Sequence, residues 1–454
     1  MRKFAILILH FFIAQSLLAQ TFEKMFTAFP ASMTIVESHD STFLVGYHAE
    51  NFLNDPGILT LNRIGDSLQY YSFQDFTVGK ILKSYNQEYL MVGKTSNGIK
   101  LIRLNSSLDT IWTRSLSTDF FYYNFEMYEM QDSTLILSGE APFGFPTHFM
   151  GSIYHLDREG NILWQSPHEE SPLASSFSCD FRDSLIYSVS NTGGANFDSV
   201  LKITCYDFFN DSVIWQKVVT DSILYGSVKL FANSTRVTDS GIIVAGFEHI
   251  DSAGVLTDKQ LVMKFDFNGN LLWSKKYNEG IFGKCVKNNS GGIVCLGTTQ
   301  DTTVLMSLDE NGNQLWKNNF RSFALSYSND LVVTNDSGYA FVCEARYSSV
   351  LAYVVKTDSL GQIDLSSNIN LLDNPGDDFD IIYFENILNI NSKTINPENS
   401  ILLVYSVNGQ MVLQKNISEI STRIDMNQFT SGEYIAAILN AKSSLRKSFK
   451  FFVH

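Results

Sequence analysis

Residues 266–273 read DFNGNLLW, and similar phrases end at each of the other four tryptophans of the chain. They are NSSLDTIW (105–112), DREGNILW (157–164), a looser FFNDSVIW (208–215) and DENGNQLW (309–316). The spacings between successive tryptophans are 52, 51, 58 and 43 residues. A period in this range is typical of repeat architectures, in which each unit is one small supersecondary structure. The tryptophans that mark the repeat are Trp112, Trp164, Trp215, Trp273 and Trp316.

A second recurring phrase lies between the tryptophans, a short turn followed by an apolar run that ends at glycine. It occurs as STFLVG (41–46), EYLMVG (88–93), STLILSG (133–139), SGIIVAG (240–246) and SGGIVCLG (290–297). Two units lack tryptophan, one at residues 58–71, with Tyr70 or Tyr71 near the tryptophan position, and one at residues 353–365. Together the phrases predict seven units between residues 21 and 370.

Each unit consists of short β-branched and aromatic runs bounded by Asp, Asn, Ser and Gly, which is typical of strands joined by tight turns. Four strands per unit at this period predict an all-β fold, a seven-bladed β-propeller. We interpret the tryptophans as structural, because a large ring buries on the order of 200 Å² between neighbouring blades. Repeated sugar-stacking platforms are the alternative. The segment Phe22–Phe26 is expected to complete the last blade beside Val350–Lys356.

The full phrase D-x-x-G-N-x-x-W is present at Asp157–Trp164, Asp266–Trp273 and Asp309–Trp316. It resembles the repeat of quinoprotein-like β-propellers, and similar arrays are common in exported proteins of the Bacteroidetes. A quinoprotein dehydrogenase would need a cofactor pocket and calcium ligands, and the sequence contains no calcium-loop motif. The resemblance therefore implies the fold rather than a redox activity, and we predict no cofactor.

The N-terminal residues 1–20 predict a secretory signal peptide. Arg2 and Lys3 precede an apolar run from Phe4 to Ala14, and Ala19 offers a small residue for cleavage. The run is too short to span a membrane, and no later stretch is long and apolar enough to do so. We therefore expect an exported chain with no membrane span.

Charge and cysteine content narrow the classes of partner. The formal net charge of −14 and the lack of a basic stripe outside the last dozen residues argue against nucleic acid. The five cysteines show neither a disulfide framework nor zinc-ligand spacing. Cys285 and Cys295 flank the turn NNSGG and could face each other across a hairpin. A disulfide between them and two buried free thiols are both open, with free thiols as the default.

The pattern changes after residue 370. Residues 371–380 contain the turn-rich, acidic stretch NPGDD and predict a linker. Residues 381–454 lack the tryptophan phrase and predict a small C-terminal β-sandwich of about six short alternating strands.

Two motifs in this C-terminal segment resemble those of the type IX secretion C-terminal sorting domain, type A. The first is VYSVNGQMVL (404–413), and the second is IDMNQFTSGEY (424–434). The Pro-Asn-Pro stretch that often opens this domain is missing, so the motifs do not define where the domain starts. The motif residues are Tyr405, Gly409, Gln410, Asp425, Gly432 and Tyr434. The resemblance implies that type IX machinery is a partner and that the protein is secreted or attached to the outer-membrane surface.

No catalytic or metal-binding constellation is predicted. The histidines have no metal-ligand spacing, and the nucleophile elbow, phosphate-binding loop and dinucleotide motifs are absent from the sequence. An aromatic insertion after the third glycine strand is the best candidate for ligand contact, because aromatic rings beside His and Thr suit carbohydrate or peptide. A long hairpin loop without a ligand is the alternative. The candidate residues are Phe143, Phe145, His148 and Phe149.

Three functions remain open for this chain. The leading hypothesis is a secreted or cell-surface, non-enzymatic binding or adhesion protein whose partner is an extracellular glycan or protein. The alternative is an extracellular hydrolase or lyase that acts on a polymer at the central funnel of the propeller. A spacer without any ligand is the third.

Overall fold

The computed structural model describes residues 20–26, 32–47, 56–116, 123–143, 148–166, 169–171, 177–193, 199–210, 212–219, 228–252, 255–288, 291–299, 302–320, 326–346, 350–363, 379–384, 387–392, 400–406, 410–417, 419, 421–439 and 445–453. Every regular element in these ranges is a strand. Contacts divide the chain into two units, Met1–Lys24 with Phe29–Ile363, and Met25–Ala28 with Asp364–His454. The predicted leader and linker lie outside the described residues, except for residues 20 and 379–380 at their borders.

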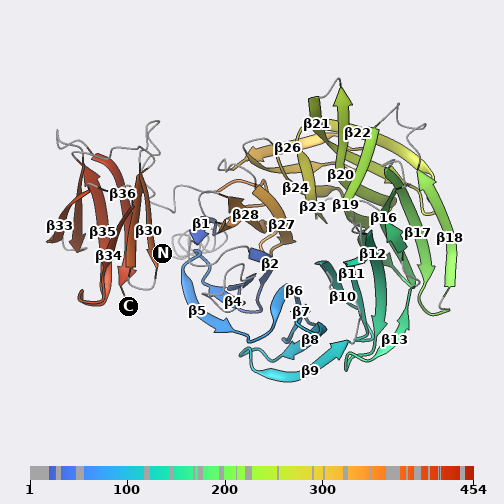
Figure 1. Cartoon of the computed structure of the whole chain (residues 1–454), viewed down its shortest axis with the longest axis horizontal. Coiled ribbons are helices and arrows are strands. Elements are labelled where there is room, and N and C mark those ends of the chain that lie inside the picture. Colours follow the sequence, from blue (N-terminus) through green and yellow to red (C-terminus); the bar gives the residue numbers. More distant parts are fainter. Residues whose placement is uncertain are drawn as a thin grey trace, which may run out of the picture. The chain divides into compact units, whose positions relative to one another are not determined.

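The first unit is a ring of seven sheets, each built on four strands (Figure 1). Blade one contains β2 (Ser32–Glu37), β3 (Phe43–Tyr47), β4 (Gly57–Leu61) and β5 (Ser67–Ser72). Blade two contains β6 (Thr77–Lys83), β7 (Tyr89–Thr95), β8 (Gly98–Leu104) and β9 (Thr110–Leu116). Blade three contains β10 (Tyr123–Glu129), β11 (Leu135–Phe143), β12 (His148–Leu156) and β13 (Ile162–Gln165), with β14 (Glu169–Ser171) paired to β12.

The remaining blades follow in chain order. Blade four contains β15 (Phe177–Arg182), β16 (Leu185–Gly193), β17 (Ser199–Asp207) and β18 (Ser212–Val219). Blade five contains β19 (Val228–Thr238), β20 (Gly241–Ser252), β21 (Val255–Phe265) and β22 (Leu271–Glu279). Blade six contains β23 (Ile281–Lys287), β24 (Ile293–Thr298), β25 (Thr303–Leu308) and β26 (Gln314–Asn319). Blade seven contains β27 (Ser326–Val333), β28 (Tyr339–Arg346), β29 (Val350–Thr357) and β1 (Phe22–Phe26).

This arrangement confirms the predicted seven-bladed propeller, including its closure. The first described strand, β1, pairs with β29 and so supplies the outermost strand of the last blade. The ring therefore joins the beginning and the end of the repeat region in one sheet.

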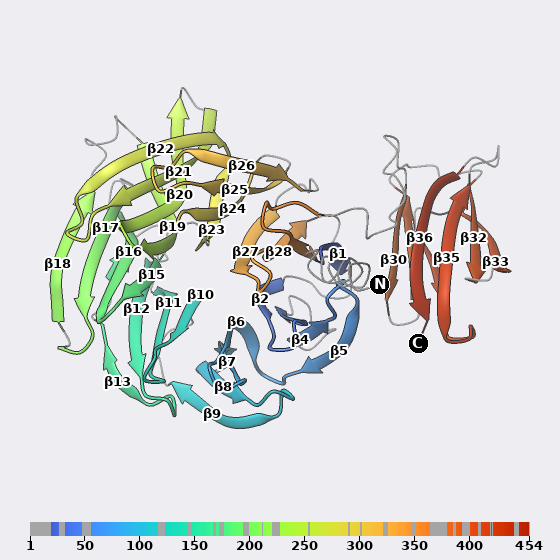
Figure 2. The ribbon, with the colours of Figure 1, turned by 180° about the vertical axis from the view of Figure 1, so that it is seen from behind.

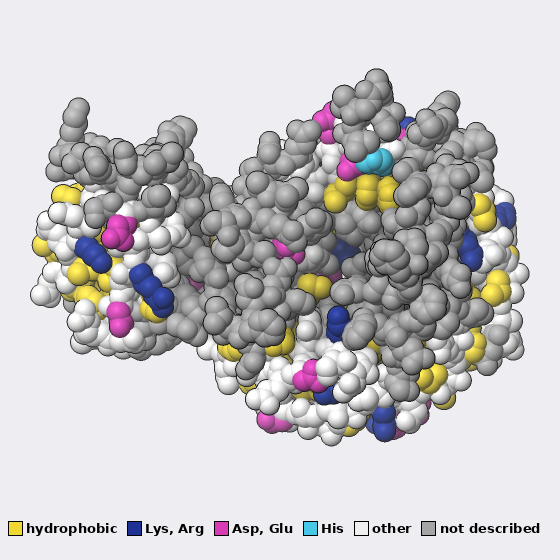
Figure 3. Space-filling model, viewed as in Figure 1, with side chains coloured by type: hydrophobic (Ala, Val, Ile, Leu, Met, Phe, Trp, Pro, Cys, Tyr) yellow, Lys and Arg dark blue, Asp and Glu magenta, His cyan; other side chains and the backbone are white. Residues whose placement is uncertain are grey.

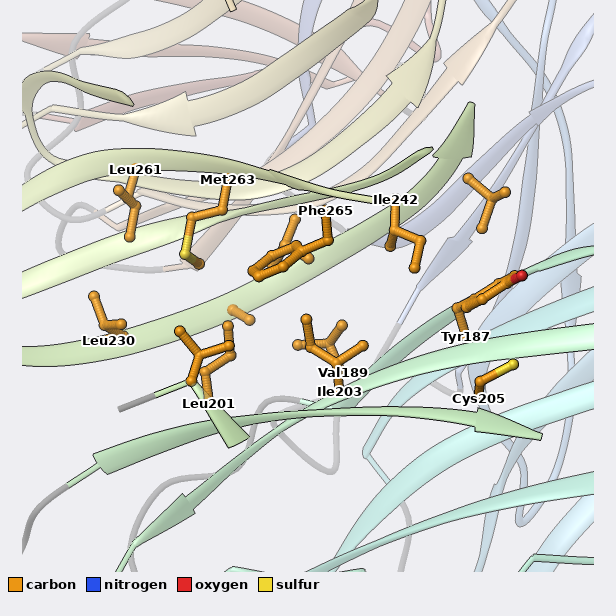
Figure 4. Close-up of a cluster of buried hydrophobic side chains, with 14 residues drawn as sticks. Tyr187, Val189, Leu201, Ile203, Cys205, Leu230, Ile242, Leu261, Met263 and Phe265 are labelled. Atoms are coloured by element: carbon orange, nitrogen blue, oxygen red, sulfur yellow. The ribbon is translucent and has the colours of Figure 1, made fainter. Parts of the chain in front are cut away.

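The cores of the propeller lie between neighbouring sheets. In one of them, Leu201 and Ile203 of blade four pack against Met263 and Phe265 of blade five, all fully buried or nearly so (Figure 4). Successive strand residues point to opposite faces, so the two faces of every sheet serve two different cores. The near-continuous apolar runs of the glycine strands follow from this, because such a strand is buried on both faces.

The tryptophans lie on the outermost strands and pack on the turn of the next blade. A Cβ atom added to Gly269 would lie 2.6 Å from the Trp215 ring, and Gly269 has a φ of 75°, which favours glycine. Asp266 closes the same turn, because its Oδ1 accepts the amides of Asn268 and Asn270 at 2.9 and 2.7 Å. Trp112, Trp273 and Trp316 pack in the same way on Gly160, Gly312 and Gly361. The recurring phrase is thus a joint between blades.

A polar clasp accompanies this joint. Lys275, two residues after Trp273, donates to Asn313 Oδ1 in the turn of the next blade at 2.8 Å. The equivalent donors in other blades reach the equivalent turns, and they are Arg114, Lys217, Asn318 and Lys24.

Two blades without tryptophan fill its position differently. In blade seven, Phe22 of β1 takes this place, since a Cβ on Gly65 would lie 2.5 Å from the Phe22 ring. In blade one, Gln69 takes the tryptophan position. It pairs with Thr60 of the neighbouring strand, as Trp112 pairs with Arg103 in blade two. The predicted tyrosines therefore lie just beyond the tryptophan position, one and two residues along the strand.

The second unit consists of two sheets packed on one core, which confirms the predicted β-sandwich. One sheet orders β30 (Phe379–Phe384), β31 (Ile387–Ser392) and β34 (Ser421–Asp425). The other orders β33 (Met411–Ile417), β32 (Ser400–Ser406), β35 (Gly432–Leu439) and β36 (Leu445–Val453). Buried side chains of both sheets, such as Leu388 and Val404, share a single cluster.

Candidate functional site

The pairing register relates each tryptophan to one residue on the innermost strand of its blade. Trp112 pairs with Arg103, Arg103 with Leu90, and Leu90 with Leu82 of β6. Counting in the same way round the ring gives a row of innermost residues, here called the tryptophan row: Val36, Leu82, Tyr128, Asp180, Arg236, Val286 and Val332. Two residues earlier lies a second row, here called the bulge row: Thr34, Lys80, Glu126, Ser178, Ser234, Lys284 and Asp330.

Side-chain oxygens of the bulge row tie one blade to the next. A β-bulge precedes this row in β2, β6, β10, β19, β23 and β27, and a bulge leaves a backbone amide out of the ladder. In four blades an amide just after the row donates to the row residue of the preceding blade, at 2.9 to 3.2 Å. The pairs are Ile35 with Asp330, Ile81 with Thr34, Thr235 with Ser178, and Cys285 with Ser234.

Two lysines of the bulge row interrupt this relay, because an ammonium group has no acceptor to offer. Lys80 of blade two donates to Asp330 of blade seven at 2.6 Å. Lys284 of blade six donates to Glu126 of blade three at 2.7 Å and so connects opposite sides of the ring. Two ion pairs, Lys80–Asp330 and Lys284–Glu126, therefore connect blades at the axis of the propeller.

The tryptophan row adds a second polar layer. Arg236 donates to the Tyr128 hydroxyl at 3.3 Å and to the Thr235 carbonyl at 2.7 Å. Asp180 accepts the Val237 amide at 2.7 Å. Polar side chains of blades three, four and five thus meet at this level, beside the edge-on contact of the Tyr128 and Phe181 rings.

The electrostatics fix the charge state of the Glu126–Lys284 pair. Burial alone would raise the pKa of Glu126, but Lys284, Arg236 and Lys80 outweigh it and lower the pKa to about 2. Burial alone would lower the pKa of Lys284, but Glu126 reverses this and raises it. Burial also raises the pKa of Asp180, with Arg236 opposing it. Both members of the pair are therefore ionised at neutral pH.

Converging carboxylates are what a hydrolase or lyase at the funnel would require. Glu126, Asp180 and Asp330 lie on three innermost strands, β10, β15 and β27, and each is at most 5% exposed. Asp330, however, accepts from Thr34, from Lys80 and from the amides of Ile35 and Leu331. A carboxylate that accepts several hydrogen bonds holds neighbouring strands together. The oxygens of the bulge row connect the blades in this way.

The face opposite the tryptophan turns is uneven. β20 and β21 have 12 and 11 residues, whereas β24 and β25 of the next blade have six each. The middle strands of blades three and four have nine residues each. Because the register is shared at the turn end, the extra length lies at the other end of the strands, where β20 and β21 extend past their neighbours (Figure 2). We call the extended ends of blades three to five the raised rim.

The predicted ligand-binding residues lie at this rim. Phe143 and His148 are register partners at the end of the β11–β12 hairpin, and Phe149 pairs with Pro142 and Ser171. Phe145 lies outside the described residues. The backbone thus places three of the four candidates together on the loop-bearing face.

A second group on the rim was not found from the sequence. Phe231 and Phe247 stack with ring centroids 4.6 Å apart and an interplanar angle of 12°. His249 Nδ1 lies 2.6 Å from Asp258 Oδ1, and Gln260 lies opposite Phe247 in the ladder. Pairing in an antiparallel ladder puts these five side chains on one side of the blade, facing blade six. We call them the fifth-blade patch, and Figure 3 shows a histidine beside hydrophobic side chains over this blade.

Gln260 is the unusual member of the patch. It is fully buried, and neither its Oε1 nor its Nε2 has a hydrogen-bond partner among the described residues. A buried amide without partners costs about 1–3 kcal/mol of stability. The sequence carried one signal of this blade's extension, since the interval from Trp215 to Trp273 is the longest of the four. It carried none that singled out Gln260.

The described ranges contain no cluster of three or more His, Cys, Asp or Glu side chains that could hold a metal ion. They also contain no helix with the length and hydropathy needed to span a membrane.

The predicted sorting motifs form one corner of the C-terminal sandwich. The Tyr434 hydroxyl donates to the Thr430 carbonyl at 2.8 Å, and Asp425 accepts the Asn427 amide at 2.9 Å. Both contacts lie in the connection between β34 and β35, and β35 begins at Gly432. Tyr405 ends the pairing of β32 with β33, and Gln410 accepts the Ser406 amide at 2.9 Å. Gly409 lies outside the described residues.

Residues 384–451 match the family model of the secretion system C-terminal sorting domain. The C-terminal unit is a sorting domain. It implies export by the type IX system and interaction with that machinery, so the protein is secreted or attached to the outer-membrane surface. Among curated proteins, no sequence matches the chain.

Solved structures with a similar fold have very different sequences. BBS1N, in complex with ARL6DN, is 8% identical, covers 77% of this chain and 96% of its own, and gives a TM-score of 0.48. The polysaccharide lyase Uly1 is also 8% identical, with 73% and 90% coverage and a TM-score of 0.48. The AfRom2 CNH domain is 10% identical, with 75% and 98% coverage and a TM-score of 0.44. At these identities the likeness concerns the fold alone.

Proposed function

We propose that the protein is a non-enzymatic binding protein, displayed on or released from the cell, that holds an extracellular glycan on its raised rim. The observation that carries the proposal is the fifth-blade patch, where an aromatic pair, a His249–Asp258 pair and the unpartnered Gln260 amide share one side of a projecting hairpin. The candidates Phe143, Phe145, His148 and Phe149 extend the same surface at blade three.

The composition of the patch favours a saccharide. Sugar rings present an apolar face that packs on aromatic rings, and their hydroxyl groups need a few placed donors and acceptors. Asp258 is the one acidic member of the patch and it is paired with His249. The net charge of −14 disfavours polyanionic ligands, so a neutral glycan fits best.

The same proposal covers the route of the chain. Residues 1–20 act as the signal peptide, residues 21–370 as the propeller, residues 371–380 as a linker and residues 381–454 as the sorting domain. The Bacteroidetes-like repeat and the sorting-domain match of residues 384–451 support this order.

A glycan array probed with the secreted protein tests the binding function, followed by titration calorimetry with the best ligand. Phe247→Ala should weaken binding at least about tenfold, because a packed aromatic anchor carries much of the binding free energy. Lys259→Ala is the matched control, since Lys259 pairs with Glu248 on the other side of the same hairpin and should leave affinity unchanged.

Gln260→Leu separates ligand contact from folding. Replacing an unpartnered buried amide by an apolar side chain of similar size should maintain or raise the midpoint of thermal unfolding, while binding weakens. Unchanged affinity in both Phe247→Ala and Gln260→Leu would remove the fifth-blade patch from the proposal. Phe145→Ala and Phe149→Ala test the blade-three hairpin in the same assay.

The hydrolase or lyase alternative predicts a different result. The glycan bound on the array would be shortened on prolonged incubation with wild-type protein, and Glu126→Gln would stop this. A ligand that stays intact through the incubation supports the binding function.

A further inference from the structure

Cys285 and Cys295 are register partners on the two inner strands of blade six. Both are fully buried, in a core that also contains Phe282 and Met306. Partners in an antiparallel ladder have side chains on the same side, so the two sulfur atoms face each other. The structure has both thiols free, like the other cysteines of the chain.

The local hydrogen bonds identify the type of pair. At the end of the hairpin, the Asn288 amide donates to the Gly292 carbonyl, so these two residues form a hydrogen-bonded pair. Bonded and non-bonded pairs alternate along the ladder, which makes Cys285 and Cys295 a non-hydrogen-bonded pair. The Cys285 amide confirms this, because it donates instead to Ser234 Oγ at 3.1 Å.

A non-hydrogen-bonded pair is the closer of the two types, with about 4.5 Å between Cα atoms. Disulfides are found with Cα atoms about 4.4–6.8 Å apart, so a bond fits here without displacing either strand. The bulge between Phe282 and Lys284 adds to this freedom, since it lies directly before Cys285.

The other cysteines have no such neighbour. Cys179 donates to Ser138 Oγ at 3.2 Å, Cys205 has Tyr187 and Trp215 as its register partners, and Cys343 lies in blade seven. Burial raises the pKa of all three thiols. At Cys285, by contrast, a hydrogen bond from Cys295 lowers the pKa, burial opposes this, and Arg236 adds to the lowering. The same hydrogen bond places the two sulfur atoms of the pair face to face in the folded blade.

We propose that Cys285 and Cys295 are joined by a disulfide in the exported protein. The oxidant is a disulfide of a thiol–disulfide oxidoreductase, met before the strands are buried. The Cys285 thiolate attacks one sulfur of that disulfide and expels a thiolate. The Cys295 thiolate then attacks the mixed disulfide at the Cys285 sulfur and expels the second. Two cysteine thiols are oxidised, one disulfide is reduced, and the two protons are taken up by the departing thiolates.

This bond would fix β23, the strand that carries Lys284, to β24. Lys284 directly precedes Cys285, and its ammonium group is the tie from blade six to Glu126 of blade three. The compartment favours the reaction, because the sorting domain sends the chain outside the reducing cytosol.

Alkylation of the secreted protein, denatured without reductant, tests the proposal directly. We expect Cys179, Cys205 and Cys343 to be modified, and a proteolytic map to contain the peptides of Cys285 and Cys295 linked and lighter by two hydrogen atoms. Modification of all five thiols in protein harvested with rapid acid quenching would overturn the proposal.

Stability provides a second measurement. Reductant should lower the unfolding temperature of the wild type by roughly 2–4 °C, as expected for a small closed loop in a domain of this size. The same reductant should leave Cys285→Ser unchanged, and Cys343→Ser should respond like the wild type. Equal responses of wild type and Cys285→Ser would contradict the disulfide even if every variant folds.

Discussion

At the scale of single residues, the Glu126–Lys284 pair shows how the axis is held together. Its two groups come from blades three and six and lie 2.7 Å apart, with 4% and 15% of the side chains exposed. Taking two charges out of water costs much of what their attraction returns, so such a pair adds little net stability. Losing one partner is different, because the other charge is then buried alone.

Acid should reveal this pair. The pKa of Glu126 is lowered from 4.5 to about 2, so its contribution to stability is present above pH 4.5 and is lost as the pH falls from 4.5 toward 2. We expect Glu126→Gln to be less stable than the wild type at neutral pH and to lose less stability over this acid range. Urea unfolding at a series of pH values measures both. Glu159→Gln, in an exposed ion pair, is the control and should follow the wild type.

The turn glycines give a second prediction at this scale. Gly269 and Gly291 both have positive φ, but only Gly269 lies against a tryptophan, whereas a Cβ on Gly291 would have one neighbour, Glu310 Oε1, at 3.1 Å. We expect Gly291→Ala to cost about 1 kcal/mol for the backbone alone. Gly269→Ala should cost about 1–3 kcal/mol more, because Trp215 must move. Equal losses in chemical denaturation would contradict the joint between blades.

Residues in turns were predictable from the sequence, and those on the axis were not. Asp266 and Gly269 act through their own backbone and the next turn, so local spacing reveals them. Lys80 and Glu126 lie on short strands of mixed pattern, and their partners come from blades that only ring closure brings near. The fifth-blade patch could not be predicted from the sequence for the same reason.

At the scale of elements, β1 is the strand on which the ring depends. It pairs with β29, and Phe22 packs on Gly65 of blade one in the place that a tryptophan takes elsewhere. Lys24 then clasps Asp66 at 3.0 Å, as Lys275 clasps Asn313. A strand of five residues thus supplies every part of the joint between blades seven and one.

Removing this strand should open the ring. Phe22→Ala should cost about 3–5 kcal/mol, because Phe22 is fully buried. Deleting residues 21–30 should lower the unfolding temperature further, since the edge of β29 is then unpaired. Lys24→Ala removes only an exposed ion pair and should change stability by less than about 1 kcal/mol. A deletion variant that melts with the wild type would refute the closure.

Strands with apolar runs were predictable, and their lengths were not. The glycine strands and the tryptophan strands follow from β-branched runs between turn residues. The extension of β20 and β21 depends on where pairing stops, which short polar segments such as FEHIDS do not indicate. In blade one, Tyr70 and Tyr71 lie near the tryptophan position as expected, and the register places Gln69 at the position itself.

At the scale of the whole molecule, two units perform two tasks. The propeller carries the rim, and the sandwich carries the sorting motifs around Tyr434 and Asp425. The overall order of domains was predictable because repeats and terminal motifs are written in the sequence itself. The ligand was not, because no local motif accompanies a surface assembled from several blades.

Separating the units should separate their tasks. A chain that ends at residue 370 should fold, keep its unfolding temperature and stay inside the outer membrane, while a reporter joined to residues 371–454 should reach the surface or the medium. Cell fractionation measures both. Tyr434→Ala in the full chain should reduce export without changing the melting of the propeller, because Tyr434 is buried in the sandwich alone. Export of the truncated chain would show that the sorting domain is dispensable.

The closure by β1 has a consequence for timing. A protein chain is synthesised from its N-terminus, so β1 must wait, unpaired, until β29 has been made. Everything after β29, including the sorting domain, arrives later still. A complete sorting domain therefore reports that the last piece of the ring already exists. A chain that carries a complete sorting domain therefore already contains every strand that the propeller needs to close.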